Sequence, residues 1–163
     1  MKNLITLEHC SLKINSSYEA FTSRFEKLAG RIGPKDVENI KSDPKGTEQH
    51  LRSLGGYQNL IIFSNFDHGA LFYMLGEPKK AKAYQIGNPL IAFSMTKFDL
   101  RAALYAPLRV LAYEDNEGTV WFEYDLPSTQ FGQFNIDEVT KVGLELDQKL
   151  AEVVRKADSK EAI

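Results

Sequence analysis

The spacing of apolar residues predicts a strand near the start of the chain. Residues 4–14 are rich in Leu, Ile and Thr, which favour extended backbone. Their partial alternation places Cys10, Leu12 and Ile14 on one face. We therefore expect a first strand in which Cys10 is a thiol of the core.

Two longer segments carry apolar residues at helical spacing. The first begins with Ser16 and Glu19 at the spacing of a capping box and stops at Gly-Pro in positions 33–34. The second has Asn135 and Glu138 as capping partners and is the last element of the chain. The apolar stripes are Phe21, Phe25, Leu28, Ala29 and Ile32 in the first segment, and Val139, Val142, Leu146, Leu150, Val153 and Val154 in the second. We expect the final helix to cover a sheet.

The middle of the chain predicts short strands joined by short helices. Residues 57–66 suit a largely buried strand, residues 68–75 a short helix ended by Gly76, and residues 82–87 a third strand. Helical signals follow Asn88. Segments of this length are typical of a sheet with short connections.

Residues 108–114 and 119–125 predict a β-hairpin around the four-residue loop Asp-Asn-Glu-Gly. In that register Arg109 lies opposite Tyr124, on the inner face of the sheet. The expected inner face contains Leu111, Tyr113, Val120, Phe122 and Tyr124, and the expected outer face contains Val110, Ala112 and Trp121. An uncovered aromatic strip usually marks an interface, so we expect a homodimer or larger assembly through Trp121, Val110 and Ala112.

The order of elements is strand, helix, three or four strands and a long final helix. It predicts an α+β fold, a two-layer sandwich with a mostly antiparallel sheet and helices on one face. Residues 34–56 carry Pro, Gly and many charges, and we interpret them as an exposed insertion rather than a domain boundary. Residues 1–163 should therefore form a single domain.

Composition excludes several classes of partner. With 20 Lys and Arg against 22 Asp and Glu, the net charge is −2, without the basic excess of a nucleic-acid-binding protein. The longest apolar runs fall short of the roughly 18 residues of a membrane span. A single cysteine, and an N-terminal segment unlike a signal peptide, make the cytoplasm the expected location.

Asp67 and His68 are the first candidate site residues. Asp67 before a short helix is a good N-cap, and His68 in the first turn has a similar structural explanation. The functional alternative is that His68 acts as a general acid or base, held by Asp67 or another carboxylate.

Two further candidates concern anions. Asn88 before Pro89 opens a helix whose free N–H groups can bind an anion, and Gly87 allows close approach, although Asn-Pro is also an ordinary helix start. Arg109 on an apolar face needs an acceptor, so it either forms a salt bridge with an acidic neighbour or binds an anion. Tyr113 and Tyr124 share the predicted face of Arg109. The acidic neighbours that we consider are Asp67, Glu123 and Asp125.

Familiar cofactor and metal motifs are missing from the sequence. His9, His50 and His68 lack the spacing of metal ligands, and one cysteine excludes the usual zinc sets. We also find no Gly-x-Ser-x-Gly, Gly-x-Gly-x-x-Gly or phosphate-binding loop. We expect no metal, and the sequence assigns no cofactor.

Four motifs, in this order, resemble the family known as domain of unknown function 302. They are Phe-Asp-His-Gly-Ala at 66–70, Ile-Gly-Asn-Pro at 86–89, the segment from Ala106 that contains Pro-Leu-Arg, and the Val-Trp hairpin from Gly118. The resemblance covers nearly the whole chain, with residues 34–56 as the departure. It implies a fold like one half of the TATA-box-binding protein, strand-helix-four strands-helix, but no DNA binding and no activity that can be transferred.

Three hypotheses follow from these residues. The first is a module that binds or senses a small anionic or amphipathic molecule. The second is an enzyme with His68 as acid or base and with Arg109 and the Asn88 helix terminus holding an anion. The third is a structural homo-oligomer without a ligand. Antiparallel pairing of the second and third strands would place Asp67 and Asn88 at opposite ends of the sheet, which favours Asn88 with Arg109 as the anion site. Asp67 is then chiefly a cap, and His68 is expected to be a partly buried pocket or interface residue.

Overall fold

A single six-stranded sheet organises the molecule. The computed structural model describes residue 2 and residues 4–159. Within these residues the strands are β1 (His9–Ile14), β2 (Gly30–Arg31), β3 (Ile61–Asp67), β4 (Ala81–Gly87), β5 (Leu108–Glu114) and β6 (Val120–Asp125). Their order across the sheet is β1-β6-β5-β4-β3-β2. Neighbouring strands are antiparallel except for β2, which runs parallel to β3.

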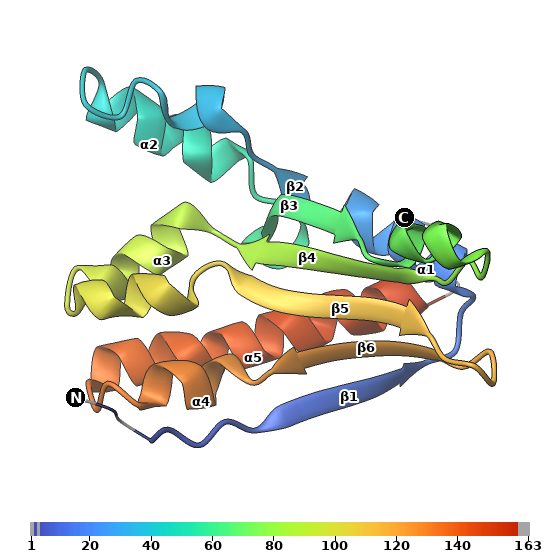
Figure 1. Cartoon of the computed structure of the whole chain (residues 1–163). Helices are drawn as coiled ribbons and strands as arrows, with labels where there is room; N and C mark the ends of the chain where they lie inside the picture. The colour runs from blue at the N-terminus through green and yellow to red at the C-terminus, as the bar shows by residue number, and fades with distance from the viewer. Residues whose placement is uncertain (1, 3, 160–163) are drawn as a thin grey trace.

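The helices lie behind the sheet and at its ends (Figure 1). The α-helices are α1 (Tyr18–Leu28), α2 (Pro44–Ser53), α3 (Pro89–Thr96), α4 (Pro127–Gly132) and α5 (Asp137–Asp158). Short 3-10 helices are η1 (Pro34–Val37), η2 (Tyr57–Asn59), η3 (Gly69–Leu75) and η4 (Leu100–Tyr105). In Figure 1 α1 and α5 lie behind the strands, and among the described residues no helix covers the front of β1, β6 and β5. The α+β sandwich with helices on one face is confirmed.

The core fills the space between the sheet and the two long helices. Phe25 of α1 is fully buried, and its ring lies 5.2 Å from the rings of both Tyr84 and Phe122. Leu146 of α5 is also buried. Cys10 packs against this core from β1, as predicted. The apolar stripes therefore face the sheet, which is why these amphipathic segments are stable as helices.

Both predicted helix caps are displaced by one residue. Ser17, not Ser16, caps α1 by accepting a hydrogen bond from the N–H of Ala20, while the hydroxyl of Ser16 donates to the carbonyl of Asp158. Helix α5 begins after Ile136, without a side-chain cap, because Asn135 adopts a left-handed conformation with φ 53°. Helix α5 lies where the sequence predicts it, but α1 ends at Leu28, short of the predicted end at residues 33–34. Gly30–Arg31 form β2 instead, so Ile32 is not part of the helical stripe.

The register of the β5–β6 hairpin differs from the prediction by one residue. Val110 lies opposite Tyr124 and Glu114 opposite Val120, so the loop has five residues, Asp115–Thr119, and not four. Asp115 accepts hydrogen bonds from the N–H groups of Glu117 and Thr119, and Gly118 takes the left-handed conformation. The N–H of Asp115 donates to the carbonyl of Thr119, so the five residues contain a three-residue turn, 116–118, closed by the left-handed glycine.

The shift turns every side chain of β5 to the other face. Val110 and Ala112 are buried in the core, so the expected outer strip of Val110, Ala112 and Trp121 is wrong. Arg109, Leu111 and Tyr113 lie on the open face instead, while Val120, Phe122 and Tyr124 of β6 are buried as predicted. Trp121 remains on the open face, where it lies opposite Tyr113.

Residues 34–56 fold into η1 and α2 rather than into an irregular loop. Asp43 caps α2 by accepting a hydrogen bond from the N–H of Gly46, and Pro44 occupies the first helical turn. Helix α2 lies near α3 at one end of the sheet (Figure 1). Within residues 2 and 4–159, no helix combines the length and the apolar character needed to cross a membrane.

Candidate functional site

The open face of the sheet gathers most of the polar side chains that the strands carry. Because strand residues alternate between faces, every second residue of β1, β6, β5 and β4 points away from the core. The open-face side chains include His9, Ser11 and Lys13 of β1, Trp121, Glu123 and Asp125 of β6, Arg109, Leu111 and Tyr113 of β5, and Ala81, Ala83 and Gln85 of β4. Strands far apart in sequence thus bring two acids, an arginine and a histidine to one surface.

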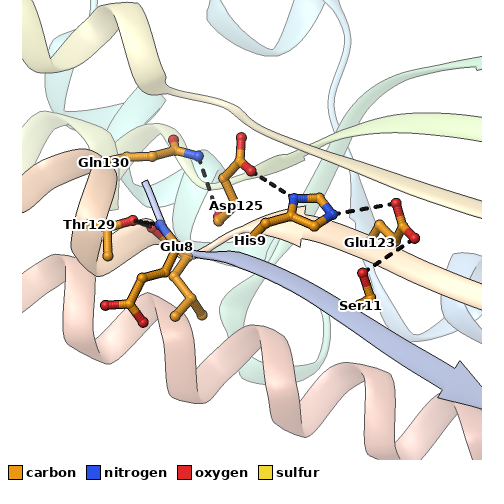
Figure 2. Close-up of polar contacts among 8 residues, drawn as sticks. Glu8, His9, Ser11, Glu123, Asp125, Thr129 and Gln130 are labelled. Carbon is orange, nitrogen blue, oxygen red and sulfur yellow. Dashed lines mark hydrogen bonds and ion pairs between the residues drawn. The ribbon is translucent and has the colours of Figure 1, made fainter. Parts of the chain in front are cut away.

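His9 lies between the two acids of β6 (Figure 2). Its Nδ1 is 2.9 Å from Oδ1 of Asp125, and its Nε2 is 3.4 Å from Oε2 of Glu123. Glu123 also accepts hydrogen bonds from the hydroxyls of Ser11 and Tyr113, at 3.3 and 3.0 Å. Since carboxylates only accept hydrogen bonds, the ring satisfies both acids when both of its nitrogens carry protons.

The electrostatics of this cluster favour a charged imidazole. The hydrogen bond to Asp125, with a smaller contribution from Glu123, raises the pKa of His9 above its ordinary value, although burial acts in the opposite direction. The pKa of Tyr113 is raised by burial and by its hydrogen bond to Glu123. The ring of His9 is therefore both oriented and biased toward its protonated form.

Helix α4, which follows β6, forms hydrogen bonds with the backbone of β1 and β6 beside His9 and Asp125. The side-chain amide of Gln130 donates to the carbonyl oxygen of Asp125 at 3.3 Å. The hydroxyl of Thr129 accepts a hydrogen bond from the N–H of Glu8, directly before His9 (Figure 2). Helix α4 thus holds the ends of β1 and β6 together beside the histidine.

Arg109 lies on the same face, beside a shallow hollow. The hollow has a volume of about 490 Å³ and is lined by Ala81, Ala83, Val110 and Leu111 on its floor. Polar side chains surround this apolar floor: Arg109, His9, His68, Glu123 and Asp125. The small side chains of β4 leave the space that the hollow occupies.

The guanidinium of Arg109 is exposed and forms no hydrogen bond or ion pair with any described residue. The predicted alternative of a salt bridge with Asp67, Asp125 or Glu123 is therefore not formed. Asp125 and Glu123 are already bound to His9, while Arg109 lies opposite Gln85 on the neighbouring strand. Five N–H donors thus point to solvent at the side of an apolar floor.

Asp67 and His68 have different roles in the structure. Asp67 accepts a hydrogen bond from the N–H of Ala70 at 3.0 Å and so satisfies a free donor at the start of η3, although the N-cap position itself is His68. His68 is exposed rather than partly buried, and its ring lies 4.8 Å from the ring of Phe66. It reaches the hollow that Arg109 lines, although the sequence placed these two residues at opposite ends of the sheet.

Asn88 is buried and fully occupied as a cap. Its Oδ1 accepts hydrogen bonds from the N–H groups of Leu90 and Ile91, at 2.8 and 3.4 Å, and its amide donates to the carbonyl of Asn59. These bonds consume the donors at the start of α3 that an anion would need. A Cβ atom added at Gly87 would make only ordinary contacts with Pro107, so local packing does not require a glycine there.

Gly87 and Asn88 line a small, mostly apolar pocket of about 110 Å³ between the end of the sheet and α3. This volume is well below the roughly 300–1,000 Å³ of small-molecule pockets. Asp67 and Gly87 lie at opposite ends of antiparallel strands, because Asp67 pairs with Lys82 and Gly87 with Ile61. Asn88 and Arg109 line different cavities. Tyr124, which we grouped with them, borders the hollow of Arg109 although its side chain is buried in the core.

The described residues contain no group of three or more His, Cys, Asp or Glu side chains that could hold a metal ion. His9 with Glu123 and Asp125 is organised by hydrogen bonds within the protein.

The chain belongs to the family described as Domain of unknown function DUF302, whose model matches residues 38–157. Its fold is similar to the crystal structure of an uncharacterized conserved protein DUF302 from Bacillus stearothermophilus. The two are 14% identical, with a TM-score of 0.64 over 91% of this chain and 97% of that chain. No curated protein matches the sequence. The family predicted from the four motifs is confirmed, and most of the segment 34–56 lies inside the matched range.

His9 is the site residue that the sequence analysis did not single out. Its partners Glu123 and Asp125 follow it by 114 and 116 residues, and no local spacing connects them. Only the pairing of β1 with β6, which sets His9 opposite Asp125, reveals the cluster.

Proposed function

We propose that the protein binds a small amphipathic anion on the open face of the sheet, with the anionic group at Arg109. The observation that carries this proposal is the unpaired guanidinium beside an apolar floor of Ala81, Ala83 and Leu111. A guanidinium has only donors, so its natural partner is a carboxylate or a phosphate. The apolar floor supports a ligand with a compact hydrophobic body.

The surroundings of Arg109 support the same assignment. Asp125 and Glu123 are occupied by His9, so their charges are partly compensated and repel an incoming anion less. His68 lies on the other side of the hollow and can donate a further hydrogen bond. The hollow volume of about 490 Å³ is within the range of small-molecule sites, which is roughly 300–1,000 Å³.

A thermal-shift screen with benzoate, phenyl phosphate and inorganic phosphate tests the proposal. Ligand binding to the folded state raises the melting temperature. We expect a shift with an aromatic anion in the parent, its loss in Arg109→Ala, and its retention in Lys27→Ala, which removes a charge from the exposed surface of α1. Stabilisation that survives Arg109→Ala but disappears in His68→Ala would overturn the proposal and return Asp67 and His68 to the centre of the site.

The geometry of His9 favours one alternative function, acid–base catalysis on the bound anion. A general acid needs an oriented and protonated ring, and Asp125 both orients His9 and favours its charged form, whereas His68 has no such partner among the described residues. If the protein converts the bound anion, His9→Gln should retain binding but abolish the conversion. One-dimensional NMR spectra of the ligand measure the conversion. Unchanged conversion in His9→Gln would remove this alternative.

A further inference from the structure

A second hollow lies between α2 and α3, away from the open face of the sheet. It has a volume of about 640 Å³ and is the space where the segment 34–56 meets α3. Figure 1 shows the two helices at the same end of the molecule. We call it the α2–α3 groove.

The groove is lined mostly by apolar side chains. Leu51 of α2 is buried at its base, while Val37 and Ile40 form one wall and Leu90 and Phe93 the other. Phe93 is 63% exposed and Ile40 is 44% exposed, so large apolar side chains face the empty space instead of packing together. A hydrocarbon chain in the groove would cover these side chains.

The charges at the groove favour an acid over a neutral lipid. Arg52 binds Glu48 through Nη2 and Oε1 at 2.5 Å, so this pair is neutral. Lys97 also lines the groove, and its ammonium lies 4.9 Å from the ring of Phe98 without an ion pair to any described residue. One uncompensated positive charge therefore lies at the rim of an apolar channel.

We propose that the α2–α3 groove binds a medium-chain aliphatic carboxylate, with the alkyl chain between Ile40 and Phe93 and the carboxylate at Lys97. The volume is within the roughly 300–1,000 Å³ typical of small-molecule pockets. Two close apolar walls suit a narrow flexible chain, and the single cation suits one terminal acid. The site shares no lining residue with the hollow beside Arg109, so it does not depend on the function proposed there.

Isothermal titration calorimetry with hexanoate, octanoate and decanoate, each below its micellar concentration, tests the apolar part. Every methylene group that the groove buries should tighten binding by roughly threefold to fourfold. Ile40→Glu places a charge in the wall and should abolish both the binding and its dependence on chain length. Because Ile40 is partly exposed, this variant should remain folded, and Phe93→Ala provides a second, milder test.

The charge is tested by Lys97→Gln against the matched control Lys141→Gln, an exposed lysine of α5. Lys97→Gln should weaken all three acids by a similar factor, roughly twofold to fivefold for an exposed pair, while the control leaves them unchanged. In the parent, 1-decanol should bind less tightly than decanoate. Equal affinities for these two would overturn the assignment of an acid.

Arg109→Ala separates this proposal from the function proposed for the open face. Decanoate binding should persist in Arg109→Ala, and its loss there would place the acid on the open face and overturn the groove site. Absence of decanoate binding in the parent, or binding that Ile40→Glu leaves intact, would also overturn it.

Discussion

The two faces of the sheet come from the same strands but carry opposite chemistry. On the covered face, Phe122 of β6 is fully buried and lies against Phe21 and Phe25 of α1. On the open face, the next residue of β6 is Glu123, which binds His9. One face holds the fold together by packing, and the other offers hydrogen-bonding groups to solvent.

This contrast indicates that a ligand site can form on the open face without a cost to the packing of the core. Burial of aromatic rings on the covered face leaves no polar group unpaired, since no buried side-chain nitrogen or oxygen of the described residues lacks a hydrogen-bond partner. The exposed Arg109 is a different case, because a surface donor has water as its alternative partner. A ligand can replace that water without disturbing the core.

The largest effects should come from the covered face. Phe25→Ala and Leu146→Ala each leave a cavity between helix and sheet, and each should lower the free energy of unfolding by about 2–5 kcal/mol. Urea unfolding measures this difference. A change within about 0.5 kcal/mol, which is normal for surface positions, would contradict the packing of these helices.

Neighbouring residues of β5 provide a direct comparison of the two faces. Val110→Ala should cost about 2 kcal/mol, because it removes two buried methyl groups and leaves a cavity. Leu111→Ala removes more carbon but from the open face, so it should cost less than about 1 kcal/mol. Urea unfolding that showed a larger loss for Leu111→Ala would restore the register predicted from the sequence.

The sequence was sufficient for the fold because helix stripes and strand order depend on many residues at once. It was insufficient for the hairpin register because β5 is apolar at 110, 111, 112 and 113, so both faces satisfy the pattern. The geometry of the turn determines which of the two registers forms. Asp115 belongs to the loop, and its side chain also accepts a hydrogen bond from the indole of Trp121 at 2.7 Å.

The candidate site was only partly accessible to the same reasoning. Asp67 and Asn88 precede helices, and their roles as caps follow from local sequence. Arg109 was recognised as a residue that needs a partner, but the predicted register placed it on the inner face and so gave it the wrong neighbours. His9 required a contact across the whole chain, which single-sequence patterns do not encode.

We propose that the protein self-associates through Trp121 and its cross-strand neighbour Tyr113 on the open face, neither of which lines the hollow of Arg109. Trp121→Asp should weaken the dimer by at least about tenfold, because burying an unpaired charge in an interface is costly. Leu144→Asp, at a 53% exposed position on α5, is the control. Sedimentation equilibrium that finds only monomer in the parent at micromolar concentration would contradict the proposal.

At the end of the sheet, Asn88→Ala should cost about 1–2 kcal/mol, because it removes the cap of α3 and the bond to Asn59. Asn88→Asp keeps the acceptor for Leu90 but places a buried carboxylate oxygen against the carbonyl of Asn59, so it should cost at least as much. Chemical denaturation of the two variants side by side provides the measurement. Equal stabilities of Asn88→Ala and the parent would show that α3 does not depend on this cap.

The smallest effect concerns the protonation of His9. Since the pKa of His9 is raised in the folded state, mainly by Asp125, the stabilisation is fully present below the unfolded pKa of about 6.5 and is lost as pH rises through the folded value. The advantage of the parent over His9→Gln in melting temperature should therefore shrink between about pH 6 and pH 8. It should be modest, because His9 lies at the surface.

An NMR titration of the His9 ring protons tests the cause of this pH dependence. Asp125→Asn removes the main interaction, so the midpoint for His9 should move down toward its ordinary value. Asp137→Asn removes a distant exposed acid at the start of α5 and should leave the midpoint in place. If Asp125→Asn left the midpoint of His9 unchanged, the cluster would not bias the ring toward its charged form, and His9 would be only a surface residue beside the hollow of Arg109.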